Sequence, residues 1–195
     1  MIAKTLCDTE LSCREQGFGL NGKARKEVGI VTFYGRQVRA IRDAIRRIQA
    51  LRNIRFSAIE YDINTVDRYQ GQERPIILVS MVRNPPFRLS QRANTAQFER
   101  INVAFSRAQE LLVVAGAKDV FCKYPVFLPH LDRPGKKKVE VYRYIIDEIQ
   151  RNGGLWSSDY IVSQQDYERL LPPGFSSKRS NGRKNQGYNH SKGRK

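Results

Sequence analysis

The stretch Ile101-Asn-Val-Ala-Phe-Ser-Arg-Ala-Gln109, with the apolar run Leu111-Leu-Val-Val-Ala115 behind it, decides the fold. We expect a helix around residues 97–106, because its apolar positions recur at helical spacing, and a short buried strand over the apolar run. At this junction the guanidinium of Arg107 would project into a cleft beside the strand, where it suits the charge of a transferring phosphoryl group. For this segment alone, a solvated arginine at a helix end is the alternative.

A second segment upstream points to the same phosphate cleft. Thr65-Val-Asp-Arg-Tyr-Gln-Gly-Gln-Glu73 is a polar, glycine-containing turn followed by the apolar run Pro75-Ile-Ile-Leu-Val-Ser-Met-Val-Arg83, for which we expect a strand over 76–82. Earlier still, Val28-Gly-Ile-Val-Thr-Phe-Tyr-Gly-Arg-Gln37 combines a predicted strand over 28–33 with the start of a helix. That helix carries apolar residues at helical spacing, namely Val38, Ile41, Ile45 and Ile48.

The order of these elements predicts the fold class. Two more strands are expected near residues 55–59 and 63–66, so strands alternate with helices along the chain. Such alternation is typical of an α/β protein with a parallel sheet and helices on both faces. Ligands of such sheets bind outside the carboxyl ends of the strands. There we expect Tyr34, the loop from Asp67 to Glu73, and the end of the strand that carries Ser80.

Three ordered blocks now carry a resemblance to a known family. The chain resembles the second RecA-like domain of superfamily 1B helicases, the group of the RNA-surveillance and senataxin-type enzymes. Residues 28–37 resemble motif IV, residues 65–73 with their trailing strand resemble motifs V and Va, and residues 102–109 resemble motif VI. The resemblance spans roughly residues 28–120. It implies a RecA-like domain with the P-loop NTPase fold but without a P-loop of its own.

The resemblance implies a role for particular residues at a nucleotide. Arg107 matches the arginine that the second domain supplies to the γ-phosphate of ATP. Gly71 and Glu73 match the Gln-Gly-x-Glu element, which implies that the glycine lets the backbone approach the nucleotide and that the glutamate is a partner for its sugar or for a cleft arginine. The alternative is a glycine turn with a surface carboxylate. Gln37 and Tyr34 match the motif IV region, as a polar group of the cleft and a stacking surface, or else as structural residues.

The resemblance also implies a track for single-stranded nucleic acid. The residues matched to it are Thr65, Arg68, Ser80 and Arg83. Hydroxyls and arginines that reach phosphates give affinity without reading sequence. Asp67 cannot bind a phosphate, so we expect it either to orient the loop or to cap the short turn after it.

The chain departs from the family pattern at three positions. Val38 stands where some members have an arginine, Gln109 replaces the second arginine of motif VI, and Phe33 replaces a common proline. These differences leave Arg107 as the sole matched phosphate arginine.

A phosphate-binding loop is absent from the sequence. Gly17-Phe-Gly-Leu-Asn-Gly-Lys23 has the spacing of one, but Ala24 follows instead of Ser or Thr, and neither a strand before it nor a helix after it is expected. We therefore expect ATP and Mg²⁺ to bind only together with a missing first RecA-like domain, so that this chain alone is inactive. No metal site of its own is expected.

Composition and charge favour a polyanionic partner. The 195 residues include 35 Lys and Arg against 19 Asp and Glu, a net charge of +16, which favours single-stranded DNA or RNA. Three widely spaced cysteines, Cys7, Cys13 and Cys122, suit reduced structural thiols better than a disulfide framework or zinc site. No apolar run is long enough to span a membrane, so we expect a cytoplasmic protein.

Four segments are expected along the chain. Residues 1–27 would form a helix, with Ile2, Leu6 and Cys13 inward, and a loop continuing from a missing upstream domain. Residues 28–123 would form the RecA-like domain. Residues 124–171 would be an extension with a loop at 124–129 and an amphipathic closing helix at 139–151, and residues 172–195 a disordered basic tail.

Two other functions stay open at this stage. The first is a non-catalytic module of helicase ancestry that binds nucleic acid or regulates a partner through its arginine-rich helix and tail. The second is an independent small-molecule α/β enzyme that uses Cys7 or His130, for which the sequence offers no supporting constellation.

Overall fold

The computed structural model describes residues 1–81 and 93–155, and its centre is a four-stranded sheet of the order β2-β1-β3-β4. The strands are β1 (Lys26–Thr32), β2 (Ile59–Thr65), β3 (Arg74–Ser80) and β4 (Ala108–Ala115). All three pairings are parallel. The predicted α/β class with a parallel sheet is therefore confirmed.

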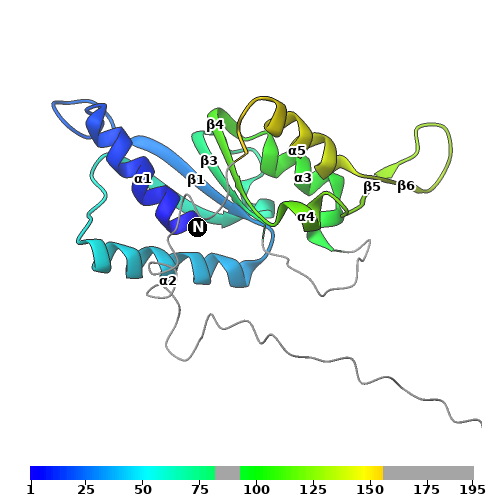
Figure 1. Cartoon of the computed structure of the whole chain (residues 1–195), viewed down its shortest axis with the longest axis horizontal. Helices are drawn as coiled ribbons and strands as arrows, with labels where there is room; N and C mark the ends of the chain where they lie inside the picture. The colour runs from blue at the N-terminus through cyan, green and yellow to red at the C-terminus, as the bar shows by residue number, and fades with distance from the viewer. Residues whose placement is uncertain (82–92, 156–195) are drawn as a thin grey trace, which may run out of the picture.

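Helices cover both faces of this sheet (Figure 1). The helices α1 (Ile2–Glu15) and α2 (Gly35–Arg52) lie on one face. On the other face lie α3 (Phe98–Phe105), α4 (Lys118–Phe121) and α5 (Val141–Arg151). Two short 3-10 helices, η1 (Val66–Tyr69) and η2 (Asn94–Ala96), occupy the connections before β3 and α3.

Two apolar cores follow from the alternation of side chains along the strands. In β1, Val28 and Ile30 face α1 and α2, whereas Val31 faces the side of α3, α4 and α5. The helices contribute the residues that the helical spacing predicts. These are Ile2, Leu6 and Cys13 from α1, with Ile41, Ile45 and Ile48 from α2, all of them buried.

The expectation of two strands over residues 55–59 and 63–66 is wrong, because the structure has the single strand β2. Residues 55–58 are held by a buried carboxylate instead. The backbone N–H groups of Ser57, Ala58 and Ile59 donate hydrogen bonds of 2.9–3.1 Å to the carboxylate of Glu10, which is fully buried in α1. A side chain thus satisfies donors that a sheet partner would otherwise take.

The expected loop over residues 124–129 is also wrong in part. Val126–Pro129 forms β5, which pairs with β6 (Lys136–Val139) as an antiparallel hairpin at one end of the molecule (Figure 1). The closing helix is confirmed as α5, which packs on the core through the buried ring of Tyr142. The basic tail over residues 172–195 lies outside the described residues. Within the described part of the chain, no helix is long and apolar enough to cross a membrane.

Candidate functional site

The residues singled out in the sequence lie at two opposite edges of the sheet. Thr65 and Ser80 end β2 and β3, and both pair with Thr32 at the end of β1, so they mark the carboxyl edge. Glu73 precedes β3 and Arg107 precedes β4, so these two mark the amino edge. A strand of seven residues separates the two edges by roughly 20 Å.

This arrangement corrects one expectation. The loop from Asp67 to Glu73 does not lie wholly at the carboxyl edge, because it connects two parallel strands and must return to the amino edge before β3 begins. Asp67 lies near the start of this connection and Glu73 at its end.

Arg107 and Glu73 lie side by side at the amino edge. Arg74 pairs with Ala108, and the Arg74 N–H donates a 3.1 Å hydrogen bond to the carbonyl of Arg107. This pairing brings the residues just upstream together, with 3.9 Å between a guanidinium nitrogen of Arg107 and Oε1 of Glu73. That distance is an ion pair but is too long for a hydrogen bond.

The guanidinium of Arg107 has unused hydrogen-bonding capacity. The side chain is only 21% exposed. Its buried Nε has no hydrogen-bond partner among residues 1–81 and 93–155. Because an unpaired buried donor is costly, the contacts within the described residues do not by themselves account for this arginine.

Gly71 makes the turn that leads to this edge. Its φ of +79° lies in the left-handed region that favours glycine. The following Gln72 N–H closes the turn with a 3.1 Å hydrogen bond to the carbonyl of Tyr69. The turn explains the glycine without a ligand, so its contact with a nucleotide stays a prediction.

Tyr69 lies in the same connection, beneath the sheet. The ring is fully buried, and its hydroxyl donates a 2.8 Å hydrogen bond to Asp62 of β2. It lies against Gly29 of β1 so closely that a Cβ there would stand 2.0 Å from the Tyr69 oxygen. Burial, together with the Asp62 hydrogen bond and charge, raises the pKa of Tyr69. Tyr69 was not predicted as a site residue, although a glycine inside an apolar strand indicates a close approach by a neighbouring group.

Gln37 and Ser80 meet at the carboxyl edge. The Gln37 amide donates a 3.4 Å hydrogen bond to the hydroxyl of Ser80, which is only 6% exposed. Tyr34 precedes α2 in an extended conformation, and its carbonyl accepts a hydrogen bond from the Gln37 N–H. The structure therefore places Gln37 and Tyr34 with Ser80 and not with Arg107.

Asp67 is bound by an arginine that sequence reasoning missed. Arg100 of α3 donates hydrogen bonds of 2.7 and 3.2 Å to the two carboxylate oxygens of Asp67. It also donates to the side chains of Asn94 and Gln97, at 2.7 and 2.9 Å. Thr65, not Asp67, is the cap residue of η1. Asp67 thus orients the connection, and the capping alternative is wrong.

Arg68 lies beside Asp67 and is exposed. Its guanidinium makes no ion pair or hydrogen bond with residues 1–81 or 93–155, so it is available to a ligand. Arg83 lies outside the described residues.

The segment from Gly17 to Lys23 has the wrong surroundings for a phosphate loop. It follows α1 and precedes β1, the reverse of the strand-loop-helix order that such a loop needs. Lys23 is also engaged, because its ammonium donates a 2.9 Å hydrogen bond to the carbonyl of Gln16 and lies 3.8 Å from the ring centre of Phe18.

Comparison with known proteins gives the family. A family model described as "AAA domain" matches residues 7–119, more than half of the chain. The chain therefore belongs to the AAA domain family, and its parallel α/β fold is that of a helicase-family RecA-like domain.

Similar proteins are helicases. The chain is 32% identical over 114 residues to "DNA replication ATP-dependent helicase/nuclease JHS1" of Arabidopsis thaliana. This match covers 58% of the chain and 8% of that protein. It is 32% identical over 99 residues to "DNA replication ATP-dependent helicase/nuclease DNA2" of Gallus gallus, covering 51% and 9%. It is 36% identical over 108 residues to "Putative helicase MOV-10" of Gallus gallus, covering 51% and 11%. The matches thus span only about a tenth of these relatives.

Proposed function

We propose that the chain is the C-terminal motor domain of an ATP-dependent helicase acting on single-stranded DNA or RNA, with Arg107 as its arginine finger. The observation that carries the proposal is the amino edge. There a mostly enclosed guanidinium with an unpaired Nε lies 3.9 Å from Glu73. The helicase relatives support the same reading, since each is several times longer than this chain and has room for a first RecA-like domain.

The residues of the amino edge fit a polyphosphate. Bound ATP would supply the γ-phosphoryl group, with Mg²⁺ held by the first domain. Arg107 would stabilise the negative charge that spreads over the phosphoryl oxygens during transfer, an effect worth about 10³ to 10⁵ in rate. Glu73 holds the arginine only loosely, so the guanidinium can change partner when an anion arrives.

The carboxyl edge fits a strand of nucleic acid. Arg68 offers an exposed guanidinium, and Thr65 offers a half-buried hydroxyl at the end of β2. Both groups suit phosphates and carry no base readout. We propose that the nucleotide and the strand contact this domain at separate edges, roughly 20 Å apart. Contacts of Ser80, Gln37 and Tyr34 with either ligand stay predictions.

The test is ATP hydrolysis by the longer protein that contains this chain together with a first RecA-like domain. We expect Arg107→Ala to lower strand-stimulated kcat by about 10³-fold or more, and Arg107→Lys to recover little of it, because one ammonium does not reproduce the guanidinium fork. The matched control is Arg151→Ala, which removes an equal charge from the exposed surface of α5.

The outcomes separate the proposal from its alternative. This chain alone should not hydrolyse ATP. Hydrolysis by the chain alone, or an unchanged kcat in the Arg107→Ala protein, would refute the arginine-finger role. Absence of hydrolysis in the longer protein as well would favour the non-catalytic module that binds nucleic acid.

A further inference from the structure

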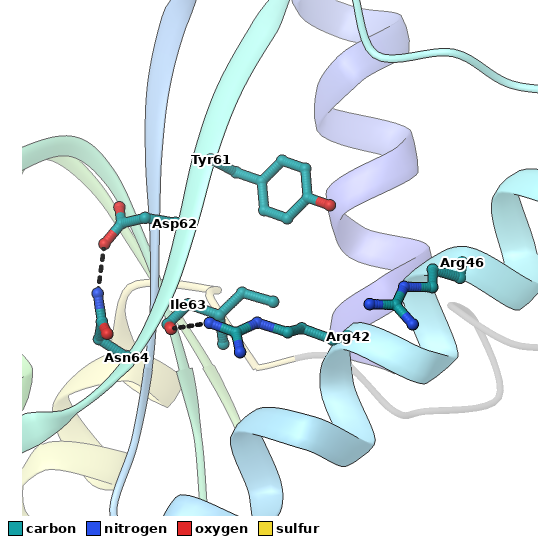
Figure 2. Close-up of a pocket in the computed structure, with 6 residues that line it drawn as sticks. All are labelled: Arg42, Arg46, Tyr61, Asp62, Ile63 and Asn64. Atoms are coloured by element: carbon teal, nitrogen blue, oxygen red, sulfur yellow. Dashed lines mark hydrogen bonds between the residues drawn. The ribbon is translucent and has the colours of Figure 1, made fainter.

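A hollow on the outer side of β2 adjoins the carboxyl edge of the sheet, since its lining residue Asn64 directly precedes Thr65. It opens to solvent between β2 and α2 and has a volume of about 370 Å³. Figure 2 shows the six residues that line it. They are Arg42, Arg46, Tyr61, Asp62, Ile63 and Asn64.

Two arginines of α2 give this hollow its positive charge. Arg42 and Arg46 are four residues apart and therefore lie on the same face of the helix. Arg42 donates a 3.4 Å hydrogen bond to the carbonyl of Ile63, which holds its guanidinium against the strand (Figure 2). Arg46 is 75% exposed and 3.7 Å from Asp43, too far for a hydrogen bond. Arg39, one turn earlier, is also exposed and extends the row.

The carboxylate of Asp62 does not neutralise these arginines. It accepts hydrogen bonds from the Tyr69 hydroxyl at 2.8 Å and from the Asn64 amide at 3.0 Å. Figure 2 shows Asp62 and Asn64 on the side of β2 away from Arg42 and Arg46. The α2 side of the hollow is therefore cationic.

Tyr61 adds an aromatic surface on the opposite, β2 side of the hollow. Its side chain points toward α2, as Arg42 points toward β2 (Figure 2). The ring is half-buried and steadied by an edge contact with Phe56 at 5.4 Å between ring centres. An aromatic ring beside two guanidinium groups is the combination that binds single-stranded nucleic acid, because the ring stacks with a base and the cations bind phosphates.

We propose that this hollow binds a phosphate-linked segment of single-stranded nucleic acid and prolongs the track beyond the carboxyl edge. Asn64 lines the hollow and Thr65 is the next residue, so a strand lying on Thr65 reaches Arg42 by passing around the edge of β2. The inference rests on the proposed function, because it requires that the domain work on a single strand. None of the residues that line the hollow belongs to the predicted nucleotide-binding residues or to the helicase motifs.

The test is the salt dependence of binding between the whole chain and fluorescein-labelled oligo(dT) of 20 nucleotides, followed by fluorescence anisotropy. We expect the double variant Arg42→Gln/Arg46→Gln to lower the slope of log K against log salt by about 1.4, since each phosphate contact with a single strand contributes about 0.7. If affinity at 1 M salt is unchanged, that slope corresponds to a loss of about 25-fold at 0.1 M salt.

The matched control is Arg143→Gln/Arg151→Gln, which removes the same charge from α5 on the opposite face of the sheet. A slope lowered only by the α2 variant supports the proposal. An equal loss in both variants, or none in either, overturns it, because general attraction to a basic protein would then explain binding. Circular dichroism melting of both variants shows that each remains folded.

A second pair of variants tests the aromatic wall. Tyr61→Leu should weaken binding by about tenfold without changing the salt slope, because stacking releases no counterions. Tyr144→Leu, an exposed tyrosine of α5, is its control and should leave affinity unchanged. Equal effects of the two substitutions would contradict the stacking role.

The strand must also be distinguished from a free nucleotide. Thymidine monophosphate at millimolar concentration should not displace the oligonucleotide, since one phosphate contacts at most part of the arginine row. Complete displacement would assign the hollow to a mononucleotide and overturn the proposal. Failure of the helicase proposal is seen separately, in ATP hydrolysis, because strand binding is measured on this chain without ATP.

Discussion

The buried carboxylate of Glu10 gives the sharpest prediction for stability. It accepts hydrogen bonds from three consecutive backbone N–H groups of residues 57–59 and from Arg14 at 2.8 Å. Glu10→Ala would leave three donors unpaired at the start of β2. Each lost bond to a charged acceptor costs about 1.5 to 3 kcal/mol. Because water can enter and such losses are not additive, we expect a total of about 3 to 5 kcal/mol.

The measurement is urea denaturation followed by circular dichroism at 222 nm. A loss of that size is a large part of the roughly 5 to 15 kcal/mol that stabilises a typical domain, so the midpoint should fall sharply. The control is Glu15→Ala, an exposed glutamate at the end of the same helix. A loss below about 1 kcal/mol for Glu10→Ala, or a loss equal to that of the control, would refute the reasoning.

The same carboxylate predicts a pH dependence. Burial alone raises the pKa of Glu10, but hydrogen bonds from Ser57, Ala58, Ile59 and Arg14 outweigh it and hold the pKa below its usual value. A lowered folded-state pKa means that the stabilisation is fully present above the unfolded value of about 4.3 and is lost as pH falls through the folded value. The difference in unfolding free energy between the native chain and Glu10→Gln should therefore shrink below about pH 4 and stay constant near neutrality.

Three further outcomes are expected. Gly29→Ala should destabilise the chain by about 3 kcal/mol in urea, because its Cβ would stand 2.0 Å from the hydroxyl of the buried Tyr69; an unchanged midpoint would contradict this packing. Native Cys7 should resist iodoacetamide at pH 8 while the more accessible Cys122 reacts, because burial raises the pKa of Cys7 to about 11; mass spectrometry that finds equal labelling would refute it. Arg100→Ala should weaken oligo(dT) binding by no more than about threefold yet raise hydrogen exchange in η1, since it orients the connection without touching phosphate; unchanged exchange would show that the arginine is dispensable.

Local pattern was sufficient for most of the sheet. Apolar runs marked β1 and β3, and the spacing of Ile41, Ile45 and Ile48 marked α2, because burial of one or both faces produces these periodicities. The run that marked β4 was predicted as a buried strand, and this is wrong: β4 is an edge strand without a buried residue, and Leu111 is 50% exposed. The edge strand β2 was misread as two strands. Its residues Glu60, Asp62 and Asn64 interrupt the apolar pattern, since an edge strand is only partly covered.

Long-range contacts were beyond the reach of pattern. Glu10 and Ser57 are 47 residues apart, and no local sequence pattern at either position predicts their hydrogen bond. The hairpin of β5 and β6 was not predicted, because its second strand is mostly lysine, a residue that is depleted in strands.

The candidate site was foreseen in residues but not in arrangement. Motif order implied that Arg107 and Glu73 share a cleft, and the structure brings them within 3.9 Å. The predicted parallel sheet already placed Tyr34 and Ser80 at the carboxyl edge, where Gln37 now contacts Ser80. The position of Glu73 at the opposite edge was not predicted, because it depends on the path of the connection between β2 and β3.

Residues 66–73 cross beneath β1 and connect the carboxyl edge of the sheet to its amino edge. They must return from the end of β2 to the start of β3, roughly 20 Å along the strands. The connection contains the 3-10 helix η1 and the turn at Gly71, whose φ is +79°. Tyr69 anchors its middle under Gly29, which prevents it from bowing outward. Because Tyr69 holds this connection against β1 between its two ends, Thr65 at the carboxyl edge and Glu73 at the amino edge share one buried anchor.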